Sequence, residues 1–275
     1  MLSKNETIKL AQILFFILLF AFANGCNSKN TTVKTTIRPE HNLPVIKEHA
    51  PEINTKKLDI KASIIDTAQQ NDRSNFGYRN GDSFLQRYSC NEKVKQIILV
   101  EQSNDITSYG TLFLIVKSKT GDWQELLRCR AYLGKNGIDK KQEGDARTPT
   151  GDFGMVMAFG AKGNPGSLIP YTKLTNTMYL CGDKEYYNQF IDVSKVNHIC
   201  SNNSEHLINY LPQYNYALIF DYNKENVYGK GSAIFLHCFG SNPFTLGCIA
   251  IAEENMVKIL NTIDANARIC IYSSK

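Results

Sequence analysis

Short apolar runs dominate the chain beyond residue 84, and most of them have the length and the β-branched content of strands. Polar turn sequences separate several of these runs, among them 119–122 and 134–137. The pattern therefore predicts a mostly β domain with few helices. The predicted strands are 95–100, 111–116, 123–132, 153–159, 216–222, 233–237, 248–251 and 268–272.

Helical periodicity is confined to the later part of the chain. Residues 253–263 predict an amphipathic helix, since acidic residues occupy the first turn and apolar residues recur at i, i+3, i+4 and i+7. A shorter helix beginning at Ser204 is also expected, with the Ser204 hydroxyl as its cap. The apolar positions of the first helix are Met256, Ile259, Leu260 and Ile263.

The first 83 residues have a different character. Residues 10–23 form an apolar stretch that is short for a membrane span of about 20 residues, and lysines precede it, as in a secretory signal. The following Ala23-Asn24-Gly25-Cys26 resembles a bacterial lipobox. We expect a signal peptide over 1–25, lipidation of Cys26, a polar linker over 26–83 and one domain over 84–275. The alternatives to lipidation are ordinary cleavage of the signal peptide and an uncleaved anchor. Each of these three arrangements places the domain outside the cytoplasm.

One pair of residues has the arrangement of a nucleophile and its base. His237 ends an apolar strand-like run, and Cys248 follows Gly247 at the start of the next run. The main-chain N–H groups of Gly247 and Cys248 would then face a developing oxyanion. Spacing alone also fits a buried structural cysteine and a hydrogen-bonded histidine. Cys238 is a weaker candidate nucleophile, because alternation along a strand directs it away from His237.

An upstream motif supports the catalytic interpretation. Residues 147–153 read Arg-Thr-Pro-Thr-Gly-Asp-Phe, and the histidine and the Gly-Cys pair follow in that order. Together these motifs resemble the L,D-transpeptidase catalytic-domain (YkuD-like) family of bacterial cell-wall enzymes, over residues 95–272. The resemblance implies an antiparallel β-sandwich with a few short helices. Leu246 and Ala250 replace the histidine and arginine usual in the family, so the chain resembles a divergent branch with a Thr-x-Gly-Cys motif.

The resemblance also implies an activity. An L,D-transpeptidase acts through a cysteine acyl-enzyme on peptidoglycan stem tetrapeptides and forms 3-3 cross-links or attaches another amine. The main-chain carbonyl of Cys238 would orient the imidazole. Arg147, Tyr171 and Asn188 are candidate substrate contacts, although such residues are also common in turns and packing. An L,D-carboxypeptidase and a non-catalytic peptidoglycan-binding lipoprotein are the alternatives.

Charge and cysteine content change this picture little. The net charge of +5 comes from scattered lysines, so we expect no nucleic-acid partner; the expected partners are stem peptides and, through the lipid anchor, a membrane.

Eight cysteines leave six after Cys26 and Cys248, enough for up to three disulfides in an exported chain. Neither His198-x-Cys200 nor His237-Cys238 with Cys248 has the paired spacing of known zinc sites, so no metal and no cofactor are expected.

Overall fold

The computed structural model describes residues 81–201 and 203–274 of the chain. The predicted signal peptide, the linker up to residue 80 and the lipidation residue Cys26 lie outside the described residues. Within the described part, no helix combines the length and the apolar character that crossing a membrane requires.

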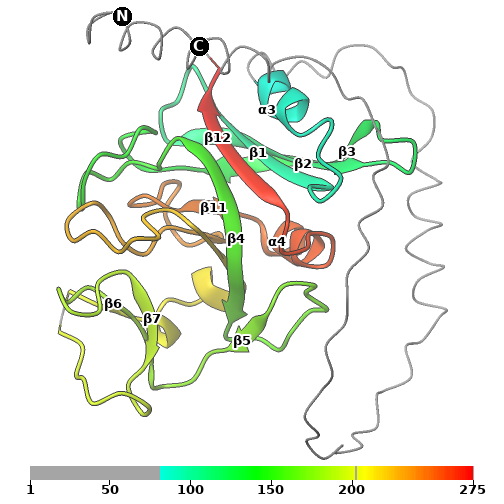
Figure 1. The fold of residues 1–275 in the computed structure, drawn as a ribbon. Helices are drawn as coiled ribbons and strands as arrows, with labels where there is room; N and C mark the ends of the chain where they lie inside the picture. The colour runs from blue at the N-terminus through cyan, green and yellow to red at the C-terminus, as the bar shows by residue number, and fades with distance from the viewer. Residues whose placement is uncertain (1–80, 202, 275) are drawn as a thin grey trace, which may run out of the picture. The chain divides into compact units, whose positions relative to one another are not determined.

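Strands make up most of the regular structure, as the apolar pattern predicts (Figure 1). The described residues contain two α-helices, α3 (Asp82–Arg87) and α4 (Glu253–Leu260), and two 3-10 helices, η1 (Leu207–Asn209) and η2 (Gln213–Asn215). The strands are β1 (Gln96–Gln102), β2 (Tyr109–Lys117), β3 (Trp123–Tyr132), β4 (Gly151–Gly160), β5 (Tyr171–Lys173), β6 (Met178–Cys181), β7 (Gln189–Asp192), β8 (Glu205–His206), β9 (Ala217–Phe220), β10 (Phe235–Cys238), β11 (Ile249–Ile251) and β12 (Arg268–Ser273).

The large sheet closes on itself. Its order is β12-β1-β2-β3-β11-β10-β9-β4-β5, and β4 also pairs with β12, so the eight strands from β12 to β4 form a ring. The pairs β1–β12, β10–β11 and β4–β5 are parallel. The sheet is therefore a closed, mixed barrel rather than the antiparallel sandwich that the resemblance implies. Closure leaves few strand edges unpaired, which explains why it is favoured over two open sheets.

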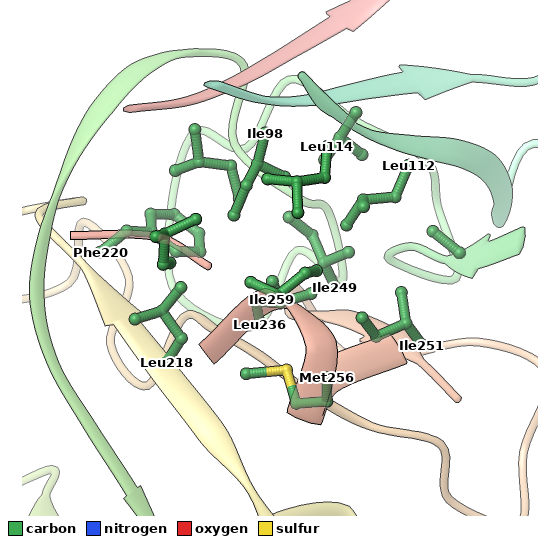
Figure 2. Close-up of a cluster of buried hydrophobic side chains, with 14 of the residues drawn as sticks. Ile98, Leu112, Leu114, Leu218, Phe220, Leu236, Ile249, Ile251, Met256 and Ile259 are labelled. Carbon is green, nitrogen blue, oxygen red and sulfur yellow. The ribbon is translucent and has the colours of Figure 1, made fainter. Parts of the chain in front are cut away.

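The barrel interior is the main hydrophobic core, shown in Figure 2. Alternate residues of β1 face opposite sides: Ile98 and Val100 belong to this core, whereas Ile97 and Leu99 belong to a second cluster that includes Leu85 of α3. Both faces of the strand are thus covered, which accounts for its unbroken apolar sequence. The same division holds for the neighbouring strands β2 and β12.

Helix α4 covers one part of the barrel core. All four apolar positions predicted from its periodicity are fully buried. Each buried side chain of this size contributes about 2 kcal/mol of hydrophobic stabilisation. The helix ends at Leu260, three residues earlier than predicted. Just beyond this end, the Thr262 hydroxyl donates to the Lys258 carbonyl at 2.7 Å.

A second, three-stranded sheet has the order β7-β6-β8. The helix expected at Ser204 is wrong, because Glu205 and His206 form β8 and only the single turn η1 follows. Pairing with β6 decides this outcome: Leu180 lies opposite Glu205, and Tyr179 lies opposite His206 with the two rings stacked. Leu180 and Glu205 of this sheet line a cavity that the barrel borders on its other side.

Candidate active site

Strands β10 and β11 place the candidate nucleophile and base on one face of the barrel sheet. Their parallel register sets Leu236 opposite Ile249 and His237 opposite Ala250. Leu236 and Cys238 point into the barrel core, so His237, between them in the strand, points outward. Cys248 packs against the outer cluster that contains Phe235. The thiol and the imidazole therefore share a face, as opposed to lying across the sheet from each other.

Both side chains line a cavity of about 870 Å³. The barrel supplies one side of this cavity, and the small sheet and the loops around it supply the other. Its polar wall includes two carboxylates and four tyrosines, and Leu246, at 74% exposure, lies at its rim. These wall residues are Glu143, Glu205, Tyr187, Tyr210, Tyr214 and Tyr228.

The His237 ring has a defined orientation. Its Nδ1 lies 2.7 Å from the Cys238 carbonyl oxygen, and the Tyr214 ring packs edge-on against it at 5.5 Å between centroids. A carbonyl only accepts, so Nδ1 carries the proton and Nε2 is left as an acceptor. Burial lowers the pKa of His237 to about 4, although the Cys238 carbonyl opposes this shift. The imidazole is therefore neutral at physiological pH.

The Cys248 thiol is also neutral at rest. It donates to the Ala233 carbonyl at 3.0 Å, and its sulfur accepts from the Phe235 N–H at 3.4 Å. Burial, and then the Glu205 carboxylate, raise the pKa of Cys248 to about 12, against the Phe235 N–H and the Lys140 ammonium. A neutral thiol and a neutral imidazole that line one cavity suit a reaction in which the imidazole accepts the thiol proton as the sulfur attacks.

The surroundings of Gly247 leave no room for a side chain. Its φ is +151°, and a Cβ there would lie 2.8 Å from Ile234 Cδ1 and 3.1 Å from the Arg147 carbonyl oxygen. The Gly247 N–H, one of the two expected oxyanion donors, already donates to Thr245 Oγ1 at 3.1 Å. A substrate oxygen would have to share or displace that partner.

Two threonine hydroxyls hold the main chain of Cys248, the candidate nucleophile. Thr245 Oγ1 donates to the Cys248 carbonyl at 2.6 Å, and Thr148 Oγ1 donates to the same oxygen at 3.1 Å. Thr148 is fully buried and also accepts from the Gly134 N–H at 2.8 Å. The Thr-Pro-Thr-Gly run thus acts on the cysteine through its first threonine, a role that sequence inspection did not assign.

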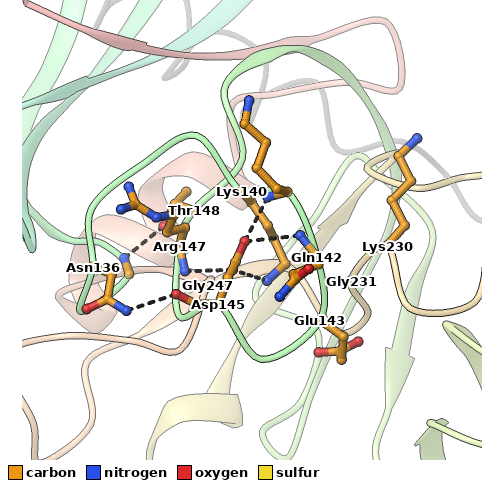
Figure 3. Close-up of polar contacts among 12 residues, drawn as sticks. Asn136, Lys140, Gln142, Glu143, Asp145, Arg147, Thr148, Lys230, Gly231 and Gly247 are labelled. Atoms are coloured by element: carbon orange, nitrogen blue, oxygen red, sulfur yellow. Dashed lines mark hydrogen bonds and ion pairs between the residues drawn. The ribbon is translucent and has the colours of Figure 1, made fainter.

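A buried ion pair braces the loop beside Gly247 (Figure 3). Lys140 Nζ donates to Asp145 Oδ1 at 2.8 Å, and the lysine side chain is only 1% exposed. Burial opposes ionisation of Asp145, but this bond and the N–H groups of Lys141, Gln142 and Arg147 outweigh it and lower the pKa of Asp145 to about 2. The loop therefore carries a permanent carboxylate that the buried ammonium needs as its partner.

The three expected substrate contacts do not line the cavity. Arg147 donates from Nη1 to the Ile138 carbonyl at 2.9 Å, and the Tyr171 hydroxyl donates to the Lys162 carbonyl at 2.8 Å. Asn188 accepts from the Ala233 N–H at 3.2 Å and so holds Ala233 at a φ of +54°. In this structure Asn188 positions the residue whose carbonyl contacts the Cys248 thiol.

Sequence inspection missed the acidic and aromatic wall of the site. The Tyr214 hydroxyl donates to Glu205 Oε2 at 2.6 Å, next to the His237 ring. Burial raises the pKa of Glu205 to about 7, the Tyr214 hydrogen bond opposes this, and Glu143 adds to it. No motif marks these residues, since they come from separate elements, β8 and η2, that meet only in the fold.

No family model matches the chain, and no curated protein matches it. Several solved structures resemble it. L,D-transpeptidase 1 of Mycobacterium tuberculosis is 13% identical, with a TM-score of 0.30 over 64% of this chain and 62% of that one. An L,D-transpeptidase from Mycobacterium smegmatis is 12% identical, with a TM-score of 0.32 over 64% and 59%.

An L,D-transpeptidase from Xylanimonas cellulosilytica is 11% identical, with a TM-score of 0.30 over 78% of this chain and 69% of that one. The chain thus spans less than two thirds of the length of the two mycobacterial structures. Similarity at this level does not assign the chain to a family, so the functional argument depends on the geometry of its own residues.

Proposed function

We propose that the protein is a cysteine-dependent L,D-transpeptidase that acts on peptidoglycan stem peptides. The observation that carries this proposal is the placement of the Cys248 thiol and the His237 ring on one sheet face, lining one cavity. The orientation of Nδ1 toward the Cys238 carbonyl leaves Nε2 to accept a proton. The ordered motifs that resemble the L,D-transpeptidase family add support from the sequence.

In the proposed reaction the Cys248 sulfur attacks the carbonyl carbon of the donor stem's L-residue-to-D-residue amide bond, and His237 Nε2 takes the thiol proton. The C–N bond then breaks, and the same proton passes to the departing D-amino acid. A thioester remains. An acceptor amine attacks it, loses a proton to His237 and releases the thiol, which restores the starting state.

The acidic wall favours an amine over water as the acceptor. The Glu143 carboxylate accepts hydrogen bonds from the Tyr187 and Ser232 hydroxyls, the latter at 2.8 Å, and borders the cavity. A fixed carboxylate attracts an ammonium group. We propose that Glu143 helps to recruit the amine of a second stem peptide, which gives a cross-link rather than carboxypeptidase activity.

We further propose that the protein is an exported lipoprotein, held to a membrane through Cys26 and facing the cell wall. The apolar stretch 10–23, the lysines before it and the lipobox-like sequence support this location. The polar linker would give the domain reach from the membrane to its substrate.

The test is a product analysis with the full chain in mild detergent and tetrapeptide muropeptides. Wild type should give a cross-linked dimer and a transient Cys248 acyl adduct in mass spectrometry, and Cys248→Ala should give neither. Cys238→Ala is the matched control, because its side chain points into the barrel core and its carbonyl is retained. Identical products from wild type and Cys248→Ala would refute the proposal.

A further inference from the structure

A second cluster of reactive side chains lies at the end of β6, formed by residues distant from the Cys248 nucleophile in sequence. Cys181, His198 and Cys200 each offer a ligand atom, and these atoms all lie within 4.8 Å of one another. Cys181 is fully buried, and the His198 side chain is 16% exposed. Two thiols and an imidazole gathered in this way form a donor set suited to a soft divalent metal.

The Asp183 carboxylate lies next to this cluster, in contact with His198. His198 Nε2 lies 3.4 Å from Cys181 Sγ and 3.0 Å from Asp183 Oδ2. A tetrahedral zinc centre with Zn–S near 2.3 Å and Zn–N and Zn–O near 2.0 to 2.1 Å has S···N and N···O edges of about 3.5 and 3.4 Å. These two separations are close to the calculated edges, and the ligand atoms of Cys181, His198 and Cys200 already lie within 4.8 Å of one another.

The surrounding residues orient the ligands. The Ser201 N–H donates to Asp183 Oδ2 at 2.9 Å, and the Ser201 hydroxyl donates to Oδ1 of the same carboxylate. The Ser204 hydroxyl donates to Cys181 Sγ at 3.6 Å. Such outer contacts fix ligand direction in known metal sites and influence metal affinity.

We propose that Cys181, Asp183, His198 and Cys200 form a structural zinc site. A disulfide between the two cysteines would not account for the approach of His198 Nε2 to both the Cys181 sulfur and the Asp183 carboxylate, which favours the metal. The site would tie the connections around β7 to the end of β6. Gly182, Asn203 and Glu205, which line the active-site cavity, belong to the same part of the chain. Zinc would therefore stabilise one wall of that cavity.

The test measures metal content rather than activity. The full chain, reduced and equilibrated with zinc, should retain one zinc per chain after dialysis, as measured by plasma mass spectrometry. His198→Ala and Cys200→Ser should bind zinc more than about ten-fold more weakly in competition with a chromophoric chelator. Cys129→Ser on β3 and Cys248→Ala are matched controls that should retain full zinc content, so this result is independent of the proposed acyl transfer.

Cobalt substitution tests the same site in the wild-type chain, so its result does not depend on whether a variant folds. It should give the intense visible bands and the thiolate charge-transfer band of a tetrahedral sulfur-containing site. Three results would overturn the proposal: a wild-type chain that retains no zinc, an octahedral cobalt spectrum, or a Cys181–Cys200 disulfide found by non-reducing peptide mapping of the chain isolated from cells.

Discussion

Replacing Glu205 with glutamine should stabilise the protein at alkaline pH and leave its stability at acid pH almost unchanged. Burial raises the pKa of Glu205 from 4.5 to about 7 in the folded protein. The native state therefore binds this proton more tightly than the unfolded state does. The resulting loss of stability is absent below about pH 4.5, grows as the pH rises through the window between the two values, and is complete above about pH 7.

The magnitude follows from the size of the shift. A difference of about 2.5 pKa units corresponds to about 3.4 kcal/mol when the carboxylate is fully ionised. Glu205 borders the cavity and is only partly shielded from solvent. Water in the cavity should therefore reduce this loss of stability to about 2 kcal/mol. Glutamine retains an oxygen that accepts the Tyr214 hydrogen bond, so the substitution removes the charge with little change in shape.

The assay is urea unfolding of the full chain in detergent, for wild type and Glu205→Gln, at several pH values from 4 to 9. The stability difference should be near zero at pH 4 and about 2 kcal/mol in favour of the variant at pH 8. Glu253→Gln is the sign control: its pKa is lowered by bonds from Lys162 and Asn215, so removing it should destabilise the protein above the unfolded pKa. A pH-independent difference for Glu205→Gln would refute the reasoning.

Three further predictions concern the same site. Asp145→Ala should lower the free energy of unfolding in urea by about 3 kcal/mol, because it leaves the buried Lys140 ammonium without its partner. Lys141→Ala removes only an exposed ion pair and should lower it by under about 1 kcal/mol. Equal losses of stability would contradict the burial argument. Gly247→Ala should destabilise by about 2 kcal/mol, since its Cβ would meet Ile234 at 2.8 Å, and an unchanged unfolding midpoint would contradict this. The Glu205 charge contributes to the raised pKa of Cys248, so Glu205→Gln should speed the alkylation of Cys248 by iodoacetamide at pH 8. Peptide mass spectrometry measures the rate, and an unchanged rate would mean that the carboxylate does not act on the thiol.

The site was predicted from the sequence only in part. The pattern marked Cys248, Gly247 and His237, because a cysteine and a histidine at the ends of adjacent apolar runs leave a local signal. Arg147, Tyr171 and Asn188 were expected to contact substrate, yet their polar groups bond to main-chain atoms of the scaffold. A motif shows that a polar residue matters but not whether its partner is a ligand or the protein itself.

The acidic wall left no such signal, and the proposed zinc site left only His198-x-Cys200, which lacks the paired spacing of known zinc sites. Glu205 reaches the cavity because β8 pairs with β6, and Cys181 meets His198 seventeen positions later because the chain returns past β7. In both cases the residues that act together lie far apart along the chain. Their spacing carries no recognisable pattern, since loop lengths between them are free to vary.

The sequence by itself determined the strands of the barrel but not those of the small sheet. All eight strands predicted from apolar runs are present, and these eight strands are the ones that form the closed ring. The apolar face of α4 was also determined by periodicity alone, because both signals depend on neighbours a few residues apart.

Only the tertiary structure decided how those strands close. The pairing of β12 with both β1 and β4 turns the expected sandwich into a barrel, and the parallel pairing of β10 with β11 sets the imidazole and the thiol on one face. Strand pairing depends on long-range contacts and on the burial of both sheet faces, which no local pattern specifies.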